Sequence, residues 1–392
     1  MKLDPYKHKE RYLAWKDKVQ EKGIGDLTHY NSKIILQYLE DMENGINVAS
    51  SSVKGSRSYI RLNTLRQKLR FFALKFQNLY NLNKITEIGE NQLCRFFSDM
   101  RKGVIRKQNG AIYQSTSYFV KNFKSFWHWW IKVNRKQGKD IKDITLDLDT
   151  RTDKPRWVYL SEKQIKKLCD NSLFKYKVLI MFLFDTGIRS PTELMNIKVS
   201  DLYNNLKELH IRDEISKTFG RKIKLMICSP LIKEFIETEK LEKNDYLFQI
   251  DPRSVNQYLK RLGKKVLGDK ASLAGQKYSE LTMYDFRHCS CCYWLPRYKS
   301  ESALKFRFGW KKSDKIHYYS EMLGMKDTIS EDDMLLDITK TELENRLQKS
   351  ESEKDLMRER MDHMEGQMKV ALKLIEKISG QIVPKLGLRI SN

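Results

Sequence analysis

The sequence lacks the long apolar runs and the frequent cysteines that mark two common classes of protein. Its longest apolar run, Val178–Phe184, is far shorter than the about 20 residues that a helix needs to span a bilayer, so we interpret it as part of a buried helix. Six cysteines in 392 residues are too few for a secreted disulfide scaffold. The charged N-terminus also has no apolar segment typical of a signal peptide. We therefore expect a cytoplasmic protein with reduced thiols, associated with the nucleoid if the source is prokaryotic.

Residues that could hold a metal are equally sparse. Cys289 and Cys292 form a single C-x-x-C without the second pair that completes a zinc site, and we interpret them as small residues that pack a helix. Two-metal nucleases need several carboxylates that converge on one point. Near the candidate site described below, the sequence offers only Glu193 and Asp285, and the acidic run at residues 331–333 is typical of a helix start. We expect no metal and no other cofactor.

Acidic residues are scarce relative to basic ones. The chain has 74 Lys and Arg against 50 Asp and Glu, which gives a formal net charge of +24. This excess predicts a polyanionic partner, with nucleic acid as the first candidate and a membrane surface as the second. A chain of this length exceeds one ordinary core, so we expect two or three domains.

Residues 28–134 are predicted to form a helical domain, after a basic N-terminal segment at residues 1–27. Apolar residues recur at helical spacing in residues 31–42, 61–80, 91–100 and 115–134. The last of these stretches is rich in aromatic rings, which can stack on bases, but we interpret its stripe as core.

Basic side chains crowd the start of the second of these helices and a later loop. At this overall charge we expect them to contact the phosphate backbone of DNA; the alternative is an ordinary solvated basic face. The candidate DNA-binding residues are Lys54, Arg57, Arg61, Arg66, Lys68, Arg70, Arg106 and Lys107.

Residues 135–158 are polar and have no helical period, so we predict an interdomain linker. A mixed α/β domain is expected at residues 159–327, with a helix that opens at the capping box Ser161-x-x-Gln164 and further helices around 178–184, 231–238 and 252–266. Two short strands, Glu208–Arg212 and Arg221–Ile227, would form a hairpin that carries Lys217. The segment Ser190-Pro191-Thr192-Glu193 has the pattern of a helix cap, which predicts a new helix directly after Arg189.

Residues 328–392 are predicted to form a C-terminal helical extension. Between residues 340 and 383, apolar residues alternate in steps of three and four, which predicts a coiled coil of middling quality because methionine specifies packing poorly. These positions are Leu343, Leu347, Met357, Met361, Met364, Met368, Ala371, Ile375, Ile378 and Ile382. We expect this helix to mediate self-association; the alternative is that it folds back on its own catalytic domain.

The second half of the chain contains an ordered set of cationic, indole and phenol side chains. Its members are Arg189, Lys217, Tyr284, Arg287, Trp310 and Tyr319. Attack on a phosphodiester spreads negative charge over the non-bridging oxygens, which fixed arginines can stabilise through bidentate hydrogen bonds. A tyrosine among these cations predicts covalent attack on the phosphate, and the phosphotyrosyl ester keeps the energy needed to reseal the strand. Lys217 would protonate the departing 5′ oxygen.

These residues stand in local sequence that resembles the tyrosine recombinase (integrase) family. Residues 186–189 (TGIR) with 193–194 and 199–202 are similar to its first signature. Residues 216–218 (SKT) followed by Arg221 are similar to its hairpin lysine, with Arg221 and Lys222 as alternative cations on the same hairpin. Residues 281–288 (LTMYDFRH) are similar to its His-x-x-Arg box. Residues 308–310 (FGW) and Tyr319, nine residues after Trp310, resemble its closing signature. The boxes occur in the family's order, and residues 28–134 fit the position of its core-binding domain.

Three departures from the family pattern concern the site. Tyr284 stands where histidine is usual, although its phenol can donate a hydrogen bond. Arg189 and Glu193 are one residue further apart than usual, and Trp310 replaces the commoner histidine while keeping an N–H donor. Tyr318 is adjacent to Tyr319, and the nine-residue spacing favours Tyr319 as the nucleophile. His288 and His317 are interpreted as structural residues or as residues that support a catalytic side chain, and not as catalytic themselves. Such variation suggests an archaeal or mobile-element branch of the family.

The resemblance implies a fold that is mainly α with a small antiparallel β-sheet, comprising a helical core-binding domain and a mixed α/β catalytic domain. It implies a site-specific DNA recombinase of a mobile genetic element, which forms a 3′-phosphotyrosyl link and a free 5′-hydroxyl without metal or ATP. The expected partner is double-stranded DNA, in a tetrameric synapse. Two alternatives stay open: a type IB-like topoisomerase, and a catalytically silent DNA-binding or architectural protein of the same fold.

Overall fold

The computed structural model describes residues 3–50, 52–152, 154–298 and 300–323, together with parts of a helix between residues 347 and 372. The chain divides into two compact units, residues 1–322 and 323–392, which are treated separately below. The first unit contains both the predicted helical domain and the predicted catalytic domain.

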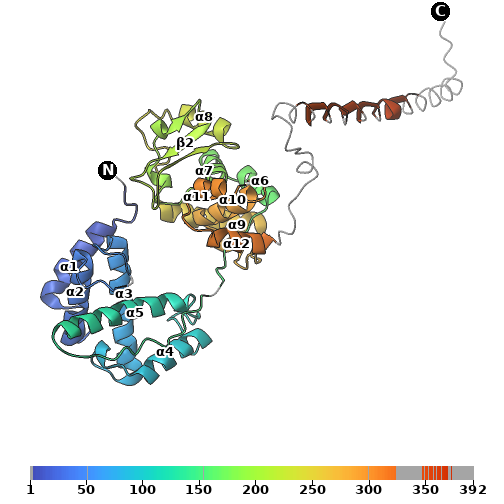
Figure 1. Cartoon of the computed structure of the whole chain (residues 1–392). Helices are drawn as coiled ribbons and strands as arrows, with labels where there is room; N and C mark the ends of the chain where they lie inside the picture. The colour runs from blue at the N-terminus through green and yellow to red at the C-terminus, as the bar shows by residue number, and fades with distance from the viewer. Residues whose placement is uncertain are drawn as a thin grey trace, which may run out of the picture. The chain divides into compact units, whose positions relative to one another are not determined.

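Five α-helices build the N-terminal part of the first unit (Figure 1). They are α1 (His8–Lys22), α2 (His29–Asn44), α3 (Tyr59–Tyr80), α4 (Glu90–Lys102) and α5 (Thr116–Lys136), with a short 3₁₀ helix, η1 (Ile85–Glu87), before α4. Thr28 and Ser58 cap α2 and α3, because each side-chain oxygen accepts a hydrogen bond from a backbone N–H of the first turn. The four helices expected here from apolar spacing are confirmed.

The aromatic stripe of α5 is core. Phe119, Phe123, Phe126 and Trp127 are buried, and Trp130 packs partly buried against the same cluster. Rings that are enclosed in this way have no face left for stacking on bases, so the interpretation of the stripe as core is confirmed.

The hydrophobic core of this part extends past both predicted limits. It begins at Tyr12 of α1 and ends at Leu148, whereas the sequence placed the helical domain at residues 28–134. Tyr12 and Val19 are buried on a helix whose other positions are mostly charged, so residues 1–27 are not merely a basic segment. The first half of the predicted linker likewise contributes Ile144 and Leu148 to this core.

The rest of the first unit is a mixed α/β structure (Figure 1). Its helices are α6 (Glu162–Asp170), α7 (Phe174–Thr186), α8 (Ser229–Thr238), α9 (Pro252–Leu267), α10 (Met283–Trp294), α11 (Glu301–Phe308) and α12 (Asp314–Leu323), with 3₁₀ helices η2 (Leu194–Asn196), η3 (Val199–Asp201) and η4 (Tyr278–Glu280). Strands β1 (Leu202–Tyr203), β2 (Glu208–Ile211) and β3 (Arg221–Lys224) form an antiparallel sheet in that order. The predicted class, mainly α with a small antiparallel sheet, is confirmed.

Two central helices, α7 and α10, pack against each other and are buried along most of their length. The small residues of α10 allow this approach, and Cys289, Cys291 and Cys292 are all buried on it. Asp185 at the end of α7 forms a buried ion pair with Arg307 of α11, at 2.9 Å between Oδ1 and Nη2. Its other oxygen accepts hydrogen bonds from the backbone N–H groups of Ile227 and Cys228.

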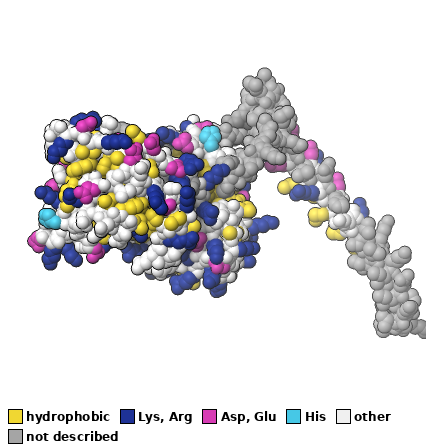
Figure 2. Space-filling view, turned by 90° about the horizontal axis from the view of Figure 1, so that it is seen from below, with side chains coloured by type: hydrophobic (Ala, Val, Ile, Leu, Met, Phe, Trp, Pro, Cys, Tyr) yellow, Lys and Arg dark blue, Asp and Glu magenta, His cyan; other side chains and the backbone are white. Residues whose placement is uncertain are grey.

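The described part of the second unit is helical between residues 347 and 372. Its apolar side chains are exposed; these are Leu347, Met357, Met361, Met364, Met368 and Leu372. Figure 2 shows apolar and basic side chains on this segment. The other predicted heptad positions, Leu343, Ala371, Ile375, Ile378 and Ile382, and the acidic run at 331–333, lie outside the described residues. Among the described helices, none has the length and apolar character required to cross a bilayer.

Candidate active site

The sequence predicted a helix directly after Arg189, and this prediction is wrong. Ser190–Pro191 is a cis peptide, the following residues form turns, and only the 3₁₀ helix η2 follows. Glu193 does not serve a helix cap but lies between two arginines. Its carboxylate accepts hydrogen bonds from Arg189 Nη1 at 2.6 Å and from Arg221 Nη2 at 2.9 Å. The guanidinium of Arg221 is fully buried, and a buried cation requires such a partner.

This carboxylate is held ionised by its neighbours. Burial alone would raise the pKa of Glu193, but the charges and hydrogen bonds of Arg221 and Arg189 lower the pKa to about 2. Arg221 is also fixed by the carbonyl of Arg307, which accepts from Nε at 2.9 Å. The pattern is therefore one carboxylate shared by two arginines.

Arg287 on α10 is fixed in another way. Its buried guanidinium donates to the carbonyl oxygens of Gly187 and Phe308, the latter at 2.6 Å. Burial and then the charge of Arg189 lower the pKa of Arg287 to about 10, so it stays protonated at neutral pH. Carbonyls orient this cation without neutralising it. Arg189 and Arg221 share the carboxylate of Glu193, whereas Arg287 is bound to carbonyl oxygens, so the cluster keeps positive charge that can attract an anion.

The carbonyl of Gly309 binds both Arg189 and the loop between β2 and β3. It accepts from Arg189 Nη2 at 2.6 Å and from Thr218 Oγ1 at 2.8 Å. Gly309 has φ of 61°, and a Cβ atom here would lie 2.9 Å from Arg221 Nη1, so both the backbone conformation and the space require glycine.

Lys217 lies on the hairpin that Thr218 anchors. The loop between β2 and β3 carries it, as predicted from the sequence, and its side chain is exposed. Within the part of the chain that the structure describes, its Nζ makes no hydrogen bond or ion pair. The loop is thus attached to the arginine cluster while the lysine itself remains available to solvent.

Tyr319 on α12 is buried, at 3% exposure, between aromatic rings. The indole of Trp310 is nearly parallel to its ring, with centroids 6.0 Å apart and an interplanar angle of 11°. The guanidinium of Arg287 lies 5.8 Å from the centroid of the same indole. Burial raises the pKa of Tyr319 well above its ordinary value, and the charge of Arg287 opposes this only in part. The structure therefore brings Arg189, Arg287, Trp310 and Tyr319 together.

The neighbouring Tyr318 is engaged elsewhere. Its hydroxyl accepts a hydrogen bond from Trp157 Nε1 at 2.8 Å and donates one to the carbonyl of Pro155 at 3.0 Å. The two adjacent tyrosines thus differ. Tyr318 binds Pro155 and Trp157, and Tyr319 lies beside the arginine cluster.

Tyr284 lies at the edge of the cluster. Its side chain is 45% exposed, and its ring meets that of His288 edge-on, with centroids 5.2 Å apart. Its hydroxyl has no hydrogen-bond partner among the described residues.

Sequence reasoning missed three residues of this site. His288 forms a hydrogen bond through Nδ1 with the Tyr319 hydroxyl, whereas the sequence indicated only a structural or supporting role. Trp157 stacks on the imidazole of His288, and Arg221 binds Glu193. His288 could have been found by helical spacing, because it lies four residues after Tyr284 and directly after Arg287. Arg221 was noted on the hairpin after Lys217 but was given no role, and nothing in the local sequence distinguished Trp157.

The eight candidate DNA-binding residues do not share one face. On the α5 side of α3, Arg61 donates to Asn122 at 2.6 Å, and Lys68 Nζ lies 3.3 Å from the ring centroid of Phe119. On the α1 side, Arg66 lies over Trp15 and Arg70 pairs with Asp26. Three others bond carbonyls of nearby loops; these are Lys54, Arg57 and Arg106.

Lys68 and Lys107 form a closer pair within this set. Burial and then the charge of Lys107 lower the pKa of Lys68 to about 8, which places the two ammonium groups in each other's field. Figure 2 shows many Lys and Arg side chains on the face of the first unit that it presents. The sequence predicted the crowding but not the direction of each side chain.

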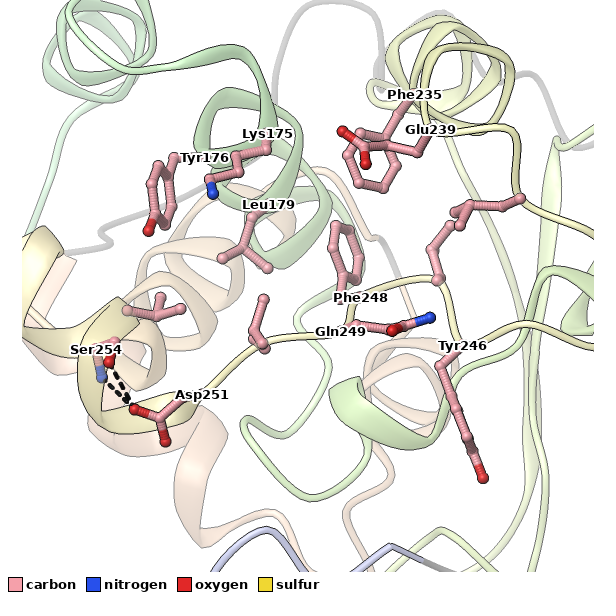
Figure 3. A pocket seen from close by; sticks show the side chains of 14 residues that line it. Lys175, Tyr176, Leu179, Phe235, Glu239, Tyr246, Phe248, Gln249, Asp251 and Ser254 are labelled. Atoms are coloured by element: carbon pink, nitrogen blue, oxygen red, sulfur yellow. Dashed lines mark hydrogen bonds between the residues drawn. The ribbon is translucent and has the colours of Figure 1, made fainter.

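A separate cavity of about 470 Å³ lies among α7, α8 and α9 (Figure 3). Its walls mix apolar residues such as Phe235 and Phe248 with polar ones such as Lys175 and Glu239. None of the candidate catalytic residues lines it.

Residues 158–323 match the model of the phage integrase family, which confirms the resemblance inferred from the motifs. The chain is similar in structure to a lambda integrase dimer bound to a COC′ core site, with a TM-score of 0.54, 13% identity, and coverage of 81% of this chain and 83% of that chain. At this identity the likeness shows a common fold. It is also similar to XerH site-specific recombinase bound to difH substrate, with a TM-score of 0.46, 15% identity and coverage of 80% and 92%. No curated protein sequence shows significant similarity to the chain.

Proposed function

From the phage integrase domain at residues 158–323, we propose that this chain is a site-specific DNA recombinase that cuts and rejoins strands through a covalent phosphotyrosine. The observation that carries the proposal is the cluster itself. Two arginines, Arg189 and Arg287, are oriented by backbone carbonyls beside the buried phenol of Tyr319. A phosphodiester is the reaction centre that such fixed cations suit best.

In the proposed reaction, the Tyr319 oxygen attacks the scissile phosphorus and the bond from phosphorus to the 5′ oxygen breaks. Arg189 and Arg287 stabilise the charge on the non-bridging oxygens, and the indole N–H of Trp310 adds a donor. Lys217, exposed on its anchored hairpin, protonates the departing 5′ oxygen. Because the arginines supply the charge stabilisation and the ester keeps the bond energy, the reaction requires neither a metal nor ATP.

We propose double-stranded DNA as the partner, in the cytoplasm or nucleoid, with a tetrameric synapse. The net charge of +24 and the cations on the α5 side of α3 support contact with the phosphate backbone. The exposed apolar side chains between residues 347 and 372 support self-association of the C-terminal helix, as the heptad pattern predicts.

One observation favours a second candidate, a catalytically silent DNA-binding protein of the same fold. Tyr284 stands where the family usually has histidine, and it is exposed at the edge of the cluster. Such a protein would bind DNA with a steep salt dependence and form no covalent adduct.

The test uses nicked suicide duplexes with a randomised core, from which the protein itself selects its target. Wild-type protein is expected to form an SDS-resistant adduct, with undiminished yield in EDTA. Tyr319→Phe abolishes the adduct, whereas Tyr318→Phe, the matched control, retains it. Binding of the selected duplexes without any adduct would favour the silent candidate, and relaxation of a supercoiled plasmid without exchange of partners would indicate a type IB-like topoisomerase.

A further inference from the structure

His288 forms a hydrogen bond with the proposed nucleophile, Tyr319. Nδ1 of the imidazole is bonded to the Tyr319 hydroxyl, and the two rings have centroids 5.7 Å apart. His288 lies on α10, directly after Arg287 and one helical turn after Tyr284. A ring nitrogen that can accept a proton when the imidazole carries its hydrogen on Nε2 is therefore positioned on the atom that the proposed reaction must deprotonate.

The imidazole is held on two sides. The indole of Trp157 stacks on it, with centroids 4.8 Å apart and an interplanar angle of 28°. Trp157 is in turn fixed by the hydrogen bond from its Nε1 to the Tyr318 hydroxyl, and the ring of Tyr284 meets the imidazole edge-on. The imidazole is thus fixed in its orientation toward the Tyr319 hydroxyl.

The other groups near the Tyr319 hydroxyl are poor proton acceptors. Arg287 is a cation already. Burial raises the pKa of the Cys291 and Cys292 thiols, to about 12 for Cys292, so both stay protonated at neutral pH. Tyr284 is itself a phenol. Burial also keeps Tyr319 protonated, so its attack requires that a base remove the proton.

We propose that His288 is the proton acceptor for Tyr319, in the place of the histidine that position 284 lacks. This rests on the proposed recombinase function. As the Tyr319 oxygen bonds to phosphorus, its proton passes to Nδ1 of His288. The bond from phosphorus to the 5′ oxygen breaks, and that oxygen takes a proton from Lys217. In rejoining, both protons return, so the cycle is balanced.

The experiment measures single-turnover cleavage of a selected suicide duplex. His288→Asn keeps an amide that can hydrogen-bond near the position of Nδ1 but cannot take up a proton. Its cleavage rate is expected to fall by about 10²–10⁴-fold, with unchanged DNA affinity and thermal unfolding. A substrate with sulfur at the bridging 5′ position has a better leaving group. It is expected to restore cleavage by Lys217→Ala and not by His288→Asn, because only the lysine acts on the leaving group.

Two results would overturn the assignment: cleavage by His288→Asn at the wild-type rate, or its rescue by the sulfur substrate to the same extent as Lys217→Ala. Should His288→Asn lose DNA binding, His288→Gln takes its place in the same comparison. If the wild-type protein itself forms no adduct, the proposed recombinase function fails. If the wild type forms the adduct and His288→Asn is fully active, only the role of His288 fails.

Discussion

The cations of the candidate active site and those of the helical part are held very differently. Arg189, Arg221 and Arg287 each donate to at least two acceptors, and Arg221 and Arg287 are buried. On α3, by contrast, Arg61 has one polar partner and Lys68 rests on an aromatic ring. Fixed cations can match the geometry of one phosphate, whereas loosely held ones can follow a backbone of any sequence. The active-site arginines are thus suited to position one phosphate, and the cations on α3 are suited to bind the DNA backbone without regard to sequence.

The strongest way to break this contrast is to remove the carboxylate that fixes two of the arginines. Glu193→Gln leaves Arg221 buried without a counter-charge, so we expect the free energy of unfolding to fall by about 3–5 kcal/mol. Denaturant titration measures it. Glu214→Gln is the control and should change stability little, because Glu214 is exposed and Arg212 keeps its pair with Asp201. Equal losses in both variants would mean that the buried cluster is held no more tightly than the surface.

The same carboxylate predicts a pH dependence. Its pKa is lowered to about 2 in the folded protein, below the about 4.3 of a free glutamate, so its contribution is present above that free value and is lost as the pH falls toward 2. We expect stability to decrease over this window in the wild type and less steeply in Glu193→Gln. Parallel pH profiles of the two proteins would argue against a paired Glu193.

Loosening one active-site cation should affect the reaction and leave the fold intact. Arg287→Lys keeps the charge but loses the planar fork that two carbonyls hold, so we expect adduct formation to slow by about 10²–10³-fold. Duplex affinity should change little. The single-turnover rate on a suicide duplex checks this, and a fall in affinity as large as the fall in rate would show that the guanidinium serves general binding.

The salt dependence of DNA binding tests whether cations of the helical part contact phosphates. Lys68→Ala and Lys107→Ala should each reduce the slope of log K against log salt by about 0.9 if each contacts one phosphate, with no preference for sequence. Arg70→Ala is the matched control, because that side chain pairs with Asp26 on the α1 side. Equal effects of all three would show that both sides of α3 contact DNA.

The smallest expected effect is on DNA affinity and comes from the protonation of Lys68. Because burial lowers the pKa of Lys68 to about 8, the free protein loses this charge above that pH, and a bound phosphate would restore it. We therefore expect DNA affinity to fall more between pH 7.5 and 9 in the wild type, by less than about tenfold, than in Lys68→Arg. Binding isotherms at constant ionic strength measure the difference, which vanishes if Lys68 does not contact DNA.

Periodicity and turn signals predicted most of the fold. Helix α3 and helix α5 were found because their apolar residues recur at helical spacing, and the hairpin because two short strands flank a polar loop. Helix α1 was missed because Tyr12 and Val19 are few apolar residues in a charged segment. The capping pattern at residues 190–193 led to a wrong prediction of a helix. Its carboxylate, that of Glu193, instead binds Arg221, which is 28 residues away in sequence and buried beside it.

The candidate site was predictable as a set of residues but not as an arrangement. Arg189, Arg287, Trp310 and Tyr319 stand in local motifs, and the structure brings them together. The contact of His288 with Tyr319 depends on how α10 and α12 pack, which no local pattern encodes. The directions of the basic side chains on α3 likewise follow from which neighbour each one meets.

Gly309 has a consequence for anyone who would retarget this protein by directed evolution. Its carbonyl accepts hydrogen bonds from Arg189 and Thr218, and a Cβ atom added to it would lie 2.9 Å from Arg221 Nη1. In a library that randomises the loop before α12, we expect nearly all substitutions of Gly309 to give inactive clones. Position 309 is best kept constant in such a library.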